Sequence, residues 1–232
     1  MAQQDVLEDA GTITVVSETS TRTEAFETVR HEDGTRTTTS VITDRGGAFR
    51  VEGRWSYDAD GRSTGAKGIG SHGGAPVDVE IAAHRPTATI SINSRNGKRT
   101  ITAPCGTSCF IDLSPSVMAM FSITRQFEAD SIDARSYQWI GQALHRDMTL
   151  TQGGGSKVRL HAVKTLDGLT VLQFMFFETL PGAESSASSE AAFNLYVDAD
   201  HRPLAFVANR GTMGLRAGYE NIPQLIPPVF VE

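Results

Sequence analysis

Apolar or β-branched residues alternate with polar ones through most of this chain, and no other feature constrains its fold as strongly. A period of two places successive side chains on opposite faces of an extended strand, one face buried and the other in water. The pattern is clear in TITVVSETSTRTEAFETV, TRTTTSVIT and AFRVEGRWSY, and later in TATISINS, KVRLHAV, LTVLQFMFFETL and LAFVANR. It predicts an all-β chain of about ten antiparallel strands.

Pairs of turn-forming residues separate these segments. An Asp or Asn followed by Gly reaches the positive backbone φ that tight hairpins require, and such pairs occur at Asp33-Gly34, Asn96-Gly97 and Asp167-Gly168. Two stretches rich in Gly or in small polar residues, at 65–76 and 181–190, are expected to be loops. The chain is therefore expected to be a meander, in which each strand pairs with the next.

Two nearly identical acidic stretches, YDADGR at 57–62 and VDADHR at 197–202, raise the question of a calcium loop. Such a loop needs oxygen ligands at alternate positions, and each stretch offers two aspartates. The third ligand position holds Arg62 in the first copy and Arg202 in the second, and a cation there opposes metal binding. We interpret both stretches as hairpin turns, and we predict no metal site and no cofactor.

One segment, DLSPSVMAMFSITRQF, departs from the alternation. Ser114 suits a helix N-cap, Pro115 suits the first helical position, and Met118 and Phe121 share one side. The pattern predicts one short helix near residues 115–127, which should cover one end or the open face of an apolar sheet. The expected fold class is all-β and mainly antiparallel: a strongly curved sheet, half-barrel or barrel with this helix.

We predict a single β-rich domain over residues 1–232, since no shift in composition marks a boundary. Residues 1–10 and 223–232 are expected to form extended or flexible ends. The 21 Lys and Arg against 27 Asp and Glu form no long block, so nucleic acid is not an expected partner. No apolar run approaches the roughly 20 residues of a membrane-spanning helix, so no transmembrane segment is predicted. The oligomeric state is left open.

Two cysteines, Cys105 and Cys109, lie close together in APCGTSCF. A structural disulfide in an oxidising compartment is the favoured interpretation, and spare thiols or a redox pair are the alternatives. Three intervening residues and no thioredoxin-like βαβ pattern oppose the redox pair. The start MAQQD fits an initiator Met placed before a mature chain. We therefore expect a periplasmic or secreted protein whose signal peptide is absent from this sequence.

The stretches FNLYVDADHRPLAFVANRGTMGLRAGYENI and DLSPSVMAMFSITRQF, the latter followed by a β region, resemble a loose group of bacterial exported β-rich proteins of unknown function. In that group a strand, an Asp turn, a Pro-Leu pair and a final strand close a curved antiparallel sheet akin to that of the periplasmic lipoprotein carriers. The resemblance covers the C-terminal half of the chain. It implies a half-barrel around a hydrophobic cavity, and it carries no catalytic residue to this sequence.

A polar cluster is suggested by LHRDMTLTQGGGSKVRLHAVKT. If GGGS forms a hairpin, pairing places His161 opposite or diagonal to Asp147, with His145 on the same face. Two imidazoles and a carboxylate would suit acid–base catalysis or a two-His, one-carboxylate metal set. The ordinary alternatives are a solvated strand face and a buried polar network. Outside this segment, His31 and His201 are both expected to be exposed.

The segment LTVLQFMFFETL is apolar on both faces, so it must be covered twice. An apolar cavity between this strand, the helix and the strand after the helix would bind a ligand. The candidate ligand-binding residues are Met118, Phe121, Arg125, Tyr137, Trp139, Phe174 and Phe176. Arg125 would meet a carboxylate or phosphate head group at the cavity mouth. The alternatives are a thick core that the apolar residues fill, and a surface charge at Arg125.

The expected function is binding or carriage of an apolar small molecule or lipid in the concavity of a β half-barrel, with Arg125, Tyr137 and His145 fixing its orientation. The alternative is a small-molecule isomerase, cyclase or hydrolase that uses His145, Asp147 and His161 in the same cavity. The sequence therefore leaves open whether the protein is an enzyme. A third possibility is an envelope-assembly protein, which predicts a large apolar surface patch.

Overall fold

The fold is all-β and mainly antiparallel, as predicted. The structure is a computed structural model that describes residues 5–45, 49–72, 74–106, 109–127, 135–144, 148–177 and 191–230. Within the strands, the side chains of residues 72, 135–139 and 148–156 are not described. The strands are β1 (Val6–Val16), β2 (Thr21–Arg30), β3 (Arg36–Asp44), β4 (Arg50–Tyr57), β5 (Ser63–His72), β6 (Ala75–His84), β7 (Thr87–Ser94), β8 (Gly97–Pro104), β9 (Cys109–Ser114), β10 (Arg135–Ala143), β11 (Met148–Leu166), β12 (Leu169–Phe177), β13 (Phe193–Asp198), β14 (Pro203–Ala208) and β15 (Met213–Arg216).

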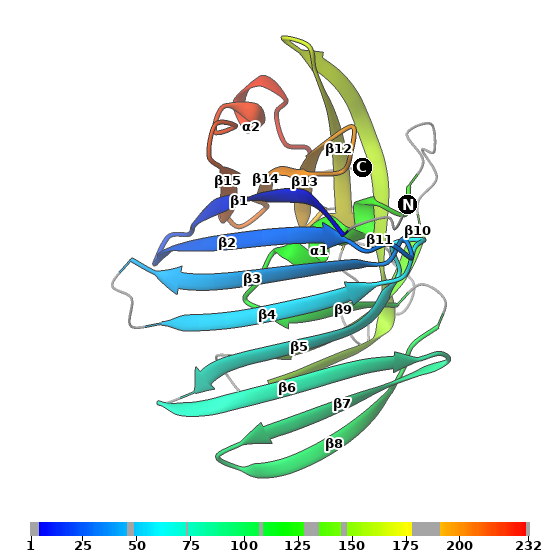
Figure 1. The fold of residues 1–232 in the computed structure, drawn as a ribbon. Coiled ribbons are helices and arrows are strands. Elements are labelled where there is room, and N and C mark those ends of the chain that lie inside the picture. Colours follow the sequence, from blue (N-terminus) through cyan, green and yellow to red (C-terminus); the bar gives the residue numbers. More distant parts are fainter. Residues whose placement is uncertain are drawn as a thin grey trace.

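These 15 strands form one sheet in the order β8-β7-β6-β5-β4-β3-β2-β1-β15-β14-β13-β12-β11-β10-β9. Strands β9 and β10 are parallel, and the other neighbours in this order are antiparallel. The helix α1 (Met118–Thr124) lies in the connection between β9 and β10, as a parallel pair requires a crossover. A second short helix, α2 (Ile222–Leu225), follows β15 (Figure 1).

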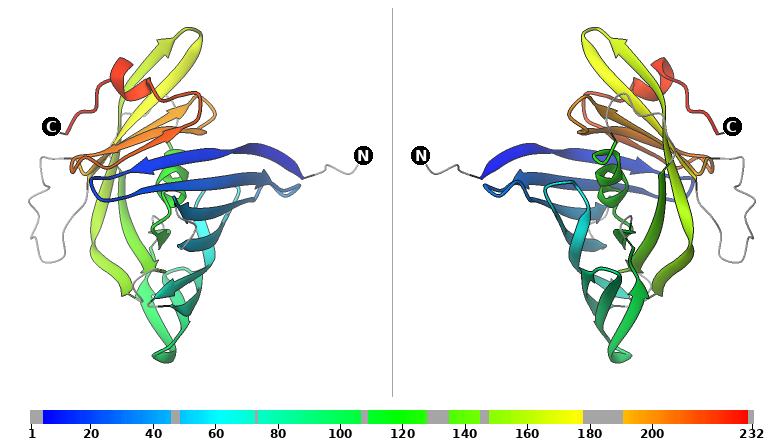
Figure 2. Two further views of the ribbon diagram at one scale, coloured as in Figure 1. Left: turned by 90° about the vertical axis from the view of Figure 1, so that its left-hand side faces the viewer. Right: turned by 90° about the vertical axis from the view of Figure 1, so that its right-hand side faces the viewer.

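The sheet folds back on itself into two wings that face each other, with α1 between them (Figure 2). We call β1 to β8 the N-wing and β9 to β15 the C-wing. The wings are joined by β1 and β15, where Ile13–Val16 pair with Met213–Arg216. The opposite edges of the sheet, β8 and β9, do not pair with each other, so the sheet is strongly curved but open.

Glycines allow the wings to approach closely at β5. A Cβ added to Gly68 would lie 2.8 Å from Leu144 and 2.9 Å from Leu113, and one added to Gly70 would lie 2.8 Å from the Cβ of Leu144. Any larger residue at these positions would separate the wings. The prediction of a loop at 65–76 is therefore wrong, because these glycines serve close packing between strands and not a turn.

The helix α1 is shorter than predicted and begins at a different place. Its N-cap is Val117, which makes no side-chain capping bond, and all seven helical residues are buried. The start of the helix is fixed instead by Glu24 of β2, which is fully buried. Its carboxylate accepts hydrogen bonds from the Ser116 hydroxyl and from the Val117 N–H, the latter at 2.9 Å. Ser114 and Pro115 precede the helix, so their predicted capping roles are wrong.

Both acidic stretches are hairpin turns, as predicted. The Asp58 Oδ1 atom accepts hydrogen bonds from the N–H groups of Asp60 and Arg62, at 3.1 and 2.8 Å, between β4 and β5. The Asp198 Oδ1 atom does the same for residues 200 and 202, at 2.9 and 2.8 Å, between β13 and β14. The aspartates are therefore used to close turns.

Both faces of β12 are covered, as its composition requires. Phe174 and Phe176 face the main core between the wings, whereas Met175 and Phe177 pack on the opposite face with Val229. The C-terminal segment is held there by Asn194, whose side chain exchanges hydrogen bonds of 2.8 and 3.0 Å with the backbone of Val229. The prediction that 223–232 is extended or flexible is wrong for the helical residues of α2.

Cys105 and Cys109 are joined by a disulfide between the end of β8 and the start of β9, with their Cα atoms 5.1 Å apart. This pairing, favoured from the sequence, bridges the two edge strands of the sheet. Among the described residues, neither helix has the length and apolar character that crossing a membrane requires.

Candidate functional site

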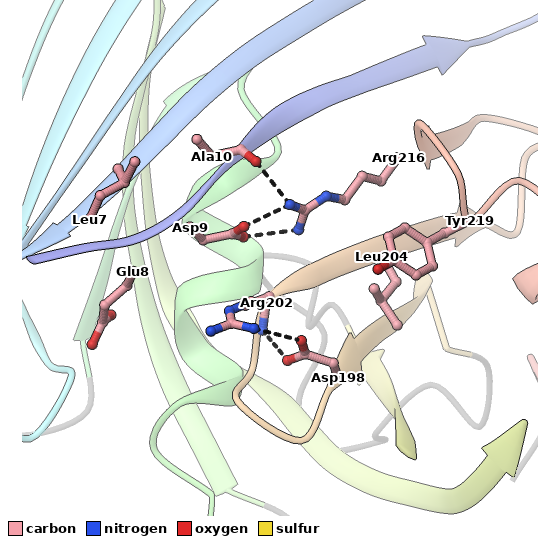
Figure 3. Close-up of a pocket in the computed structure, with 9 residues that line it drawn as sticks. All are labelled: Leu7, Glu8, Asp9, Ala10, Asp198, Arg202, Leu204, Arg216 and Tyr219. Atoms are coloured by element: carbon pink, nitrogen blue, oxygen red, sulfur yellow. Dashed lines mark hydrogen bonds and ion pairs between the residues drawn. The ribbon is translucent and has the colours of Figure 1, made fainter. Parts of the chain in front are cut away.

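The sheet opens where β1 extends beyond β15. Residues 13–16 of β1 pair with β15, but residues 6–11 are paired on the β2 side alone. A cleft of about 330 Å³ lies between this half of β1 and the β13–β14 turn, with α1 behind it (Figure 3). We call it the β1–β14 cleft, and its lining residues are Leu7, Glu8, Asp9, Ala10, Asp198, Arg202, Leu204, Arg216 and Tyr219. Its volume is at the lower end of the range for small-molecule sites.

A β-bulge shapes the β1 wall of this cleft. Leu7 pairs with Val29 and Asp9 pairs with Thr28, so Glu8 is an extra residue without a partner position on β2. A bulge changes the direction of the side chains around it and often lies next to a functional site. Here Glu8 and Asp9, two successive carboxylates, both line the cleft.

Three arginines from three elements surround Glu8. Its carboxylate lies 3.1 Å from Arg30 Nε at the end of β2, 3.0 Å from Arg36 Nε at the start of β3, and 2.8 Å from Arg125 Nη1 after α1. Burial alone would raise the pKa of Glu8, but the hydrogen bonds and charges of Arg36 and Arg125 outweigh it and hold the pKa below its usual value. Glu8 therefore stays ionised, and the cluster carries more positive than negative charge.

Asp9 is held by a single arginine in a bidentate ion pair. Its oxygens lie 2.6 and 2.9 Å from the Nη2 and Nη1 atoms of Arg216, and both side chains are largely buried. The guanidinium also lies 5.4 Å from the ring centre of Phe26 and 5.9 Å from that of Tyr219. This pair ties β1 to β15 at the point where backbone pairing between them stops.

A second, smaller cavity of about 10 Å³, enough for one water molecule, is lined by His201 and Pro203, which alternate along the chain with the cleft residues Arg202 and Leu204. Arg36 and Arg125, which hold Glu8, also line this cavity. The buried Tyr57 hydroxyl faces it beside Ser122, whose own hydroxyl donates to the Ala119 carbonyl. No hydrogen bond of ordinary geometry satisfies the Tyr57 hydroxyl, and burial raises its pKa. It is therefore protonated, with the Ser122 hydroxyl beside it and no acceptor of ordinary geometry among the described residues.

His201 reaches the same small cavity from the β13–β14 turn. Its backbone φ is +60°, which is a left-handed conformation. At the equivalent position of the first acidic turn, Gly61 has a φ of +78°. The His201 ring lies 6.2 Å from that of Phe174, and its buried Nδ1 atom has no hydrogen-bond partner among the residues that the structure describes. Burial and the charge of Arg125 lower its pKa to about 4, so the ring is neutral at pH 7. The prediction that His201 is exposed is wrong.

The predicted ligand-binding residues divide into three groups. Met118, Phe121, Phe174 and Phe176 are buried together in the main core, against the two wings. Arg125 lines the small cavity and contacts Glu8, which lines the cleft, and its role toward a head group stays a prediction. The side chains of Tyr137 and Trp139, on β10, lie outside the described residues.

The hairpin that was predicted to bring the catalytic cluster together does not form. GGGS is not a turn, because β11 runs unbroken from Met148 to Leu166 and pairs first with β10 and then with β12. Met148 and His161 are thus about 40 Å apart along one strand. His161 is exposed and occupies a bulge opposite β12, while His145 and Asp147 lie outside the described residues.

Sequence patterns missed Glu8, Arg36, Tyr57 and His201. A bulge leaves no local signature in an alternating strand, and the arginines around Glu8 come from the β2–β3 turn and from the end of α1, both distant from Glu8 in the chain. A signal was present at the second acidic turn, where His201 replaces the glycine of the first turn. A bulky residue at a position that demands positive φ indicates a constraint beyond the turn itself.

Fold and site together define an all-β protein with an open, folded antiparallel sheet and a charged cleft at the junction of its two wings. No protein-family model and no curated protein sequence matches this chain. Among solved structures, a DUF1089 family protein from Pseudomonas aeruginosa is similar, with 17% sequence identity and a TM-score of 0.46. The match covers 85% of this chain and 88% of that protein. The comparisons returned no lipoprotein carrier.

Proposed function

We propose that this protein binds an apolar small molecule or lipid non-covalently, with the β1–β14 cleft as the place where the ligand enters and is held. The observation that carries the proposal is the interruption of the sheet at β1, which leaves a ligand-sized cleft above α1. The gap leaves residues 6–11 of β1 without a strand partner on that side among the described strands, although the Ala10 carbonyl accepts a hydrogen bond from Arg216. A site for a ligand accounts for the gap.

The cleft combines the two kinds of surface that such a ligand needs. Leu7 and Tyr219 supply apolar contacts, and Leu7 is 59% exposed. The arginines at Glu8 and Asp9 supply polar contacts at one end. Apolar packing would give affinity, and the charged groups would orient the molecule.

Titration with the uncharged fluorescent probe N-phenyl-1-naphthylamine tests the proposal. Wild-type protein should enhance the probe's fluorescence with a saturating curve. Leu7→Asp should weaken binding about fivefold, because it removes roughly 1 kcal/mol of apolar contact. Ile69→Asp is the matched control, since Ile69 of β5 is similarly exposed, at 56%, but does not line the cleft. An absent signal, or equal losses in both variants, would contradict the proposal.

Export to the periplasm or beyond is proposed as well, with support from the Cys105–Cys109 pair. Thiol titration of denatured protein isolated from its own cells should find both cysteines blocked. Two free thiols would contradict it. The enzyme and envelope-assembly alternatives stay predictions.

A further inference from the structure

The position of Glu8 shows how an anion is held in this fold. Its carboxylate is surrounded by guanidinium groups from β2, β3 and the end of α1, although Glu8 itself belongs to none of these elements. It reaches them because it is the extra residue of a bulge on the half of β1 that has no β15 partner. The arginines that bind the anion thus come from β2, β3 and the end of α1, whereas the anion, the Glu8 carboxylate, comes from β1.

The arginines have more hydrogen-bonding capacity than Glu8 uses. Each guanidinium carries five N–H donors, whereas Arg30 contacts Glu8 through Nε, Arg36 through Nε and Arg125 through Nη1. Arg36 also donates from Nη1 to the Ala59 carbonyl at 3.5 Å. On the far side, the unpaired Tyr57 hydroxyl and the neutral His201 ring face the same small cavity as Arg36 and Arg125. Donors therefore outnumber acceptors, as they do in sites for carboxylates and phosphates.

Resting on the proposed function, we propose that the ligand is an anionic amphiphile whose carboxylate or phosphate head displaces Glu8 from Arg30, Arg36 and Arg125. The exchange substitutes one anion for another, so the guanidinium groups keep their hydrogen bonds and their neutralisation. The released Glu8 can turn to solvent from the unpaired end of β1. The apolar part of the ligand then lies along Leu7 and Tyr219.

Four amphiphiles with the same twelve-carbon chain separate the head group from the tail: dodecanoate, dodecyl phosphate, dodecanol and dodecyltrimethylammonium. Each is titrated calorimetrically, the ionic three below their micelle concentrations and dodecanol below its solubility limit. Dodecanoate and dodecyl phosphate should bind at least about tenfold more tightly than dodecanol, as charged hydrogen bonds predict. The tighter of these two anions identifies the head group. The cation should bind most weakly.

Glu8→Gln removes the resident anion with little change of shape. It should strengthen binding of the two anions about tenfold and change dodecanol binding less than twofold. Glu27→Gln is the control, since it makes the same chemical change on the exposed face of the adjacent strand β2. Arg36→Lys keeps the charge but loses the planar fork, and it should reduce the preference for the anions.

The outcomes separate this inference from the proposed function. If dodecanol binds as tightly as the anions, or if Glu8→Gln leaves anion affinity unchanged, the inference is wrong and the proposed function stands. If none of the four amphiphiles binds, the proposed function fails and the inference fails with it. Should Glu8→Gln not fold, the wild-type head-group series and Arg36→Lys decide the matter.

Discussion

Acid should destabilise this protein through His201, and the size of the effect follows from the structure. The imidazole has a pKa of about 4 in the folded protein, against the ordinary value of 6.5. Between these two values the unfolded chain binds a proton that the folded chain does not. The contribution of His201 to stability is therefore complete above pH 6.5 and is lost as the pH falls toward 4.

The full difference in pKa corresponds to about 3 kcal/mol between pH 7 and pH 4. His201 is only partly buried, so solvent screening reduces the expected loss to about 2 kcal/mol. The substitution His201→Asn should remove this part of the pH dependence, and Asn tolerates the left-handed conformation at φ +60°. His161→Asn, at an exposed site on β11, is the matched control.

Urea unfolding at half-unit pH steps from 7 to 4 measures the effect. Wild-type protein and His161→Asn should lose stability along similar curves. The His201→Asn curve should be flatter by about 2 kcal/mol over the same range. If the His201→Asn curve runs parallel to that of the wild type, the buried imidazole does not control acid stability and the argument is refuted.

Three further substitutions test other parts of the fold. Burial raises the pKa of Glu24, so its ionisation costs stability increasingly as the pH rises above 4.5. Glu24→Gln should reduce this fall of the unfolding free energy with pH, as measured by urea unfolding. An unchanged slope of unfolding free energy against pH would contradict it. Gly70→Ala should cost about 1–3 kcal/mol in thermal unfolding, because the new Cβ would press on Leu144 across the wings; no loss would contradict the close approach. Arg216→Lys should cost about 1–2 kcal/mol, since it breaks the bidentate pair with Asp9; full stability at low salt would argue against that pair.

The strands and their turns could be predicted from the sequence because both depend on neighbouring residues. Alternation identified β2 and β3, and Asp-Gly or Asn-Gly pairs marked hairpins such as the one at Asp167, where φ is +48°. The double burial of β12 could also be predicted, since apolar residues at successive positions 174 to 177 leave no solvated face there.

The wrong predictions of a loop at 65–76 and of a hairpin at GGGS arose because glycine serves both turns and close packing between strands. Gly153–Gly155 and Gly68–Gly70 were both assigned to connections, yet the first group continues a long strand through a register shift and the second lets two wings meet. Local sequence does not distinguish a glycine needed for positive φ from one needed for a close approach. The distinction depends on what packs against the strand.

The site itself depends on contacts between distant residues, so a single sequence could indicate only its parts. Arg125 was identified as a residue at a cavity mouth from its place after the helix. Its partner Glu8 lies 117 positions away, and their meeting depends on a bulge and on the path of β1 over α1. Neither leaves a pattern in the sequence of either segment.

The seam between β1 and β15 also has a consequence for biosynthesis. Among the described strands, β1 is made before the other strands of the sheet, but its second neighbour β15 is made after them, and Asp9 meets Arg216 across 207 positions of chain. Until then β1 presents a free edge that can pair with the wrong strand or with another chain. The contact order is high, so folding should be slow and should finish at this seam. A nascent chain held extended by a chaperone until β15 is made would avoid that hazard.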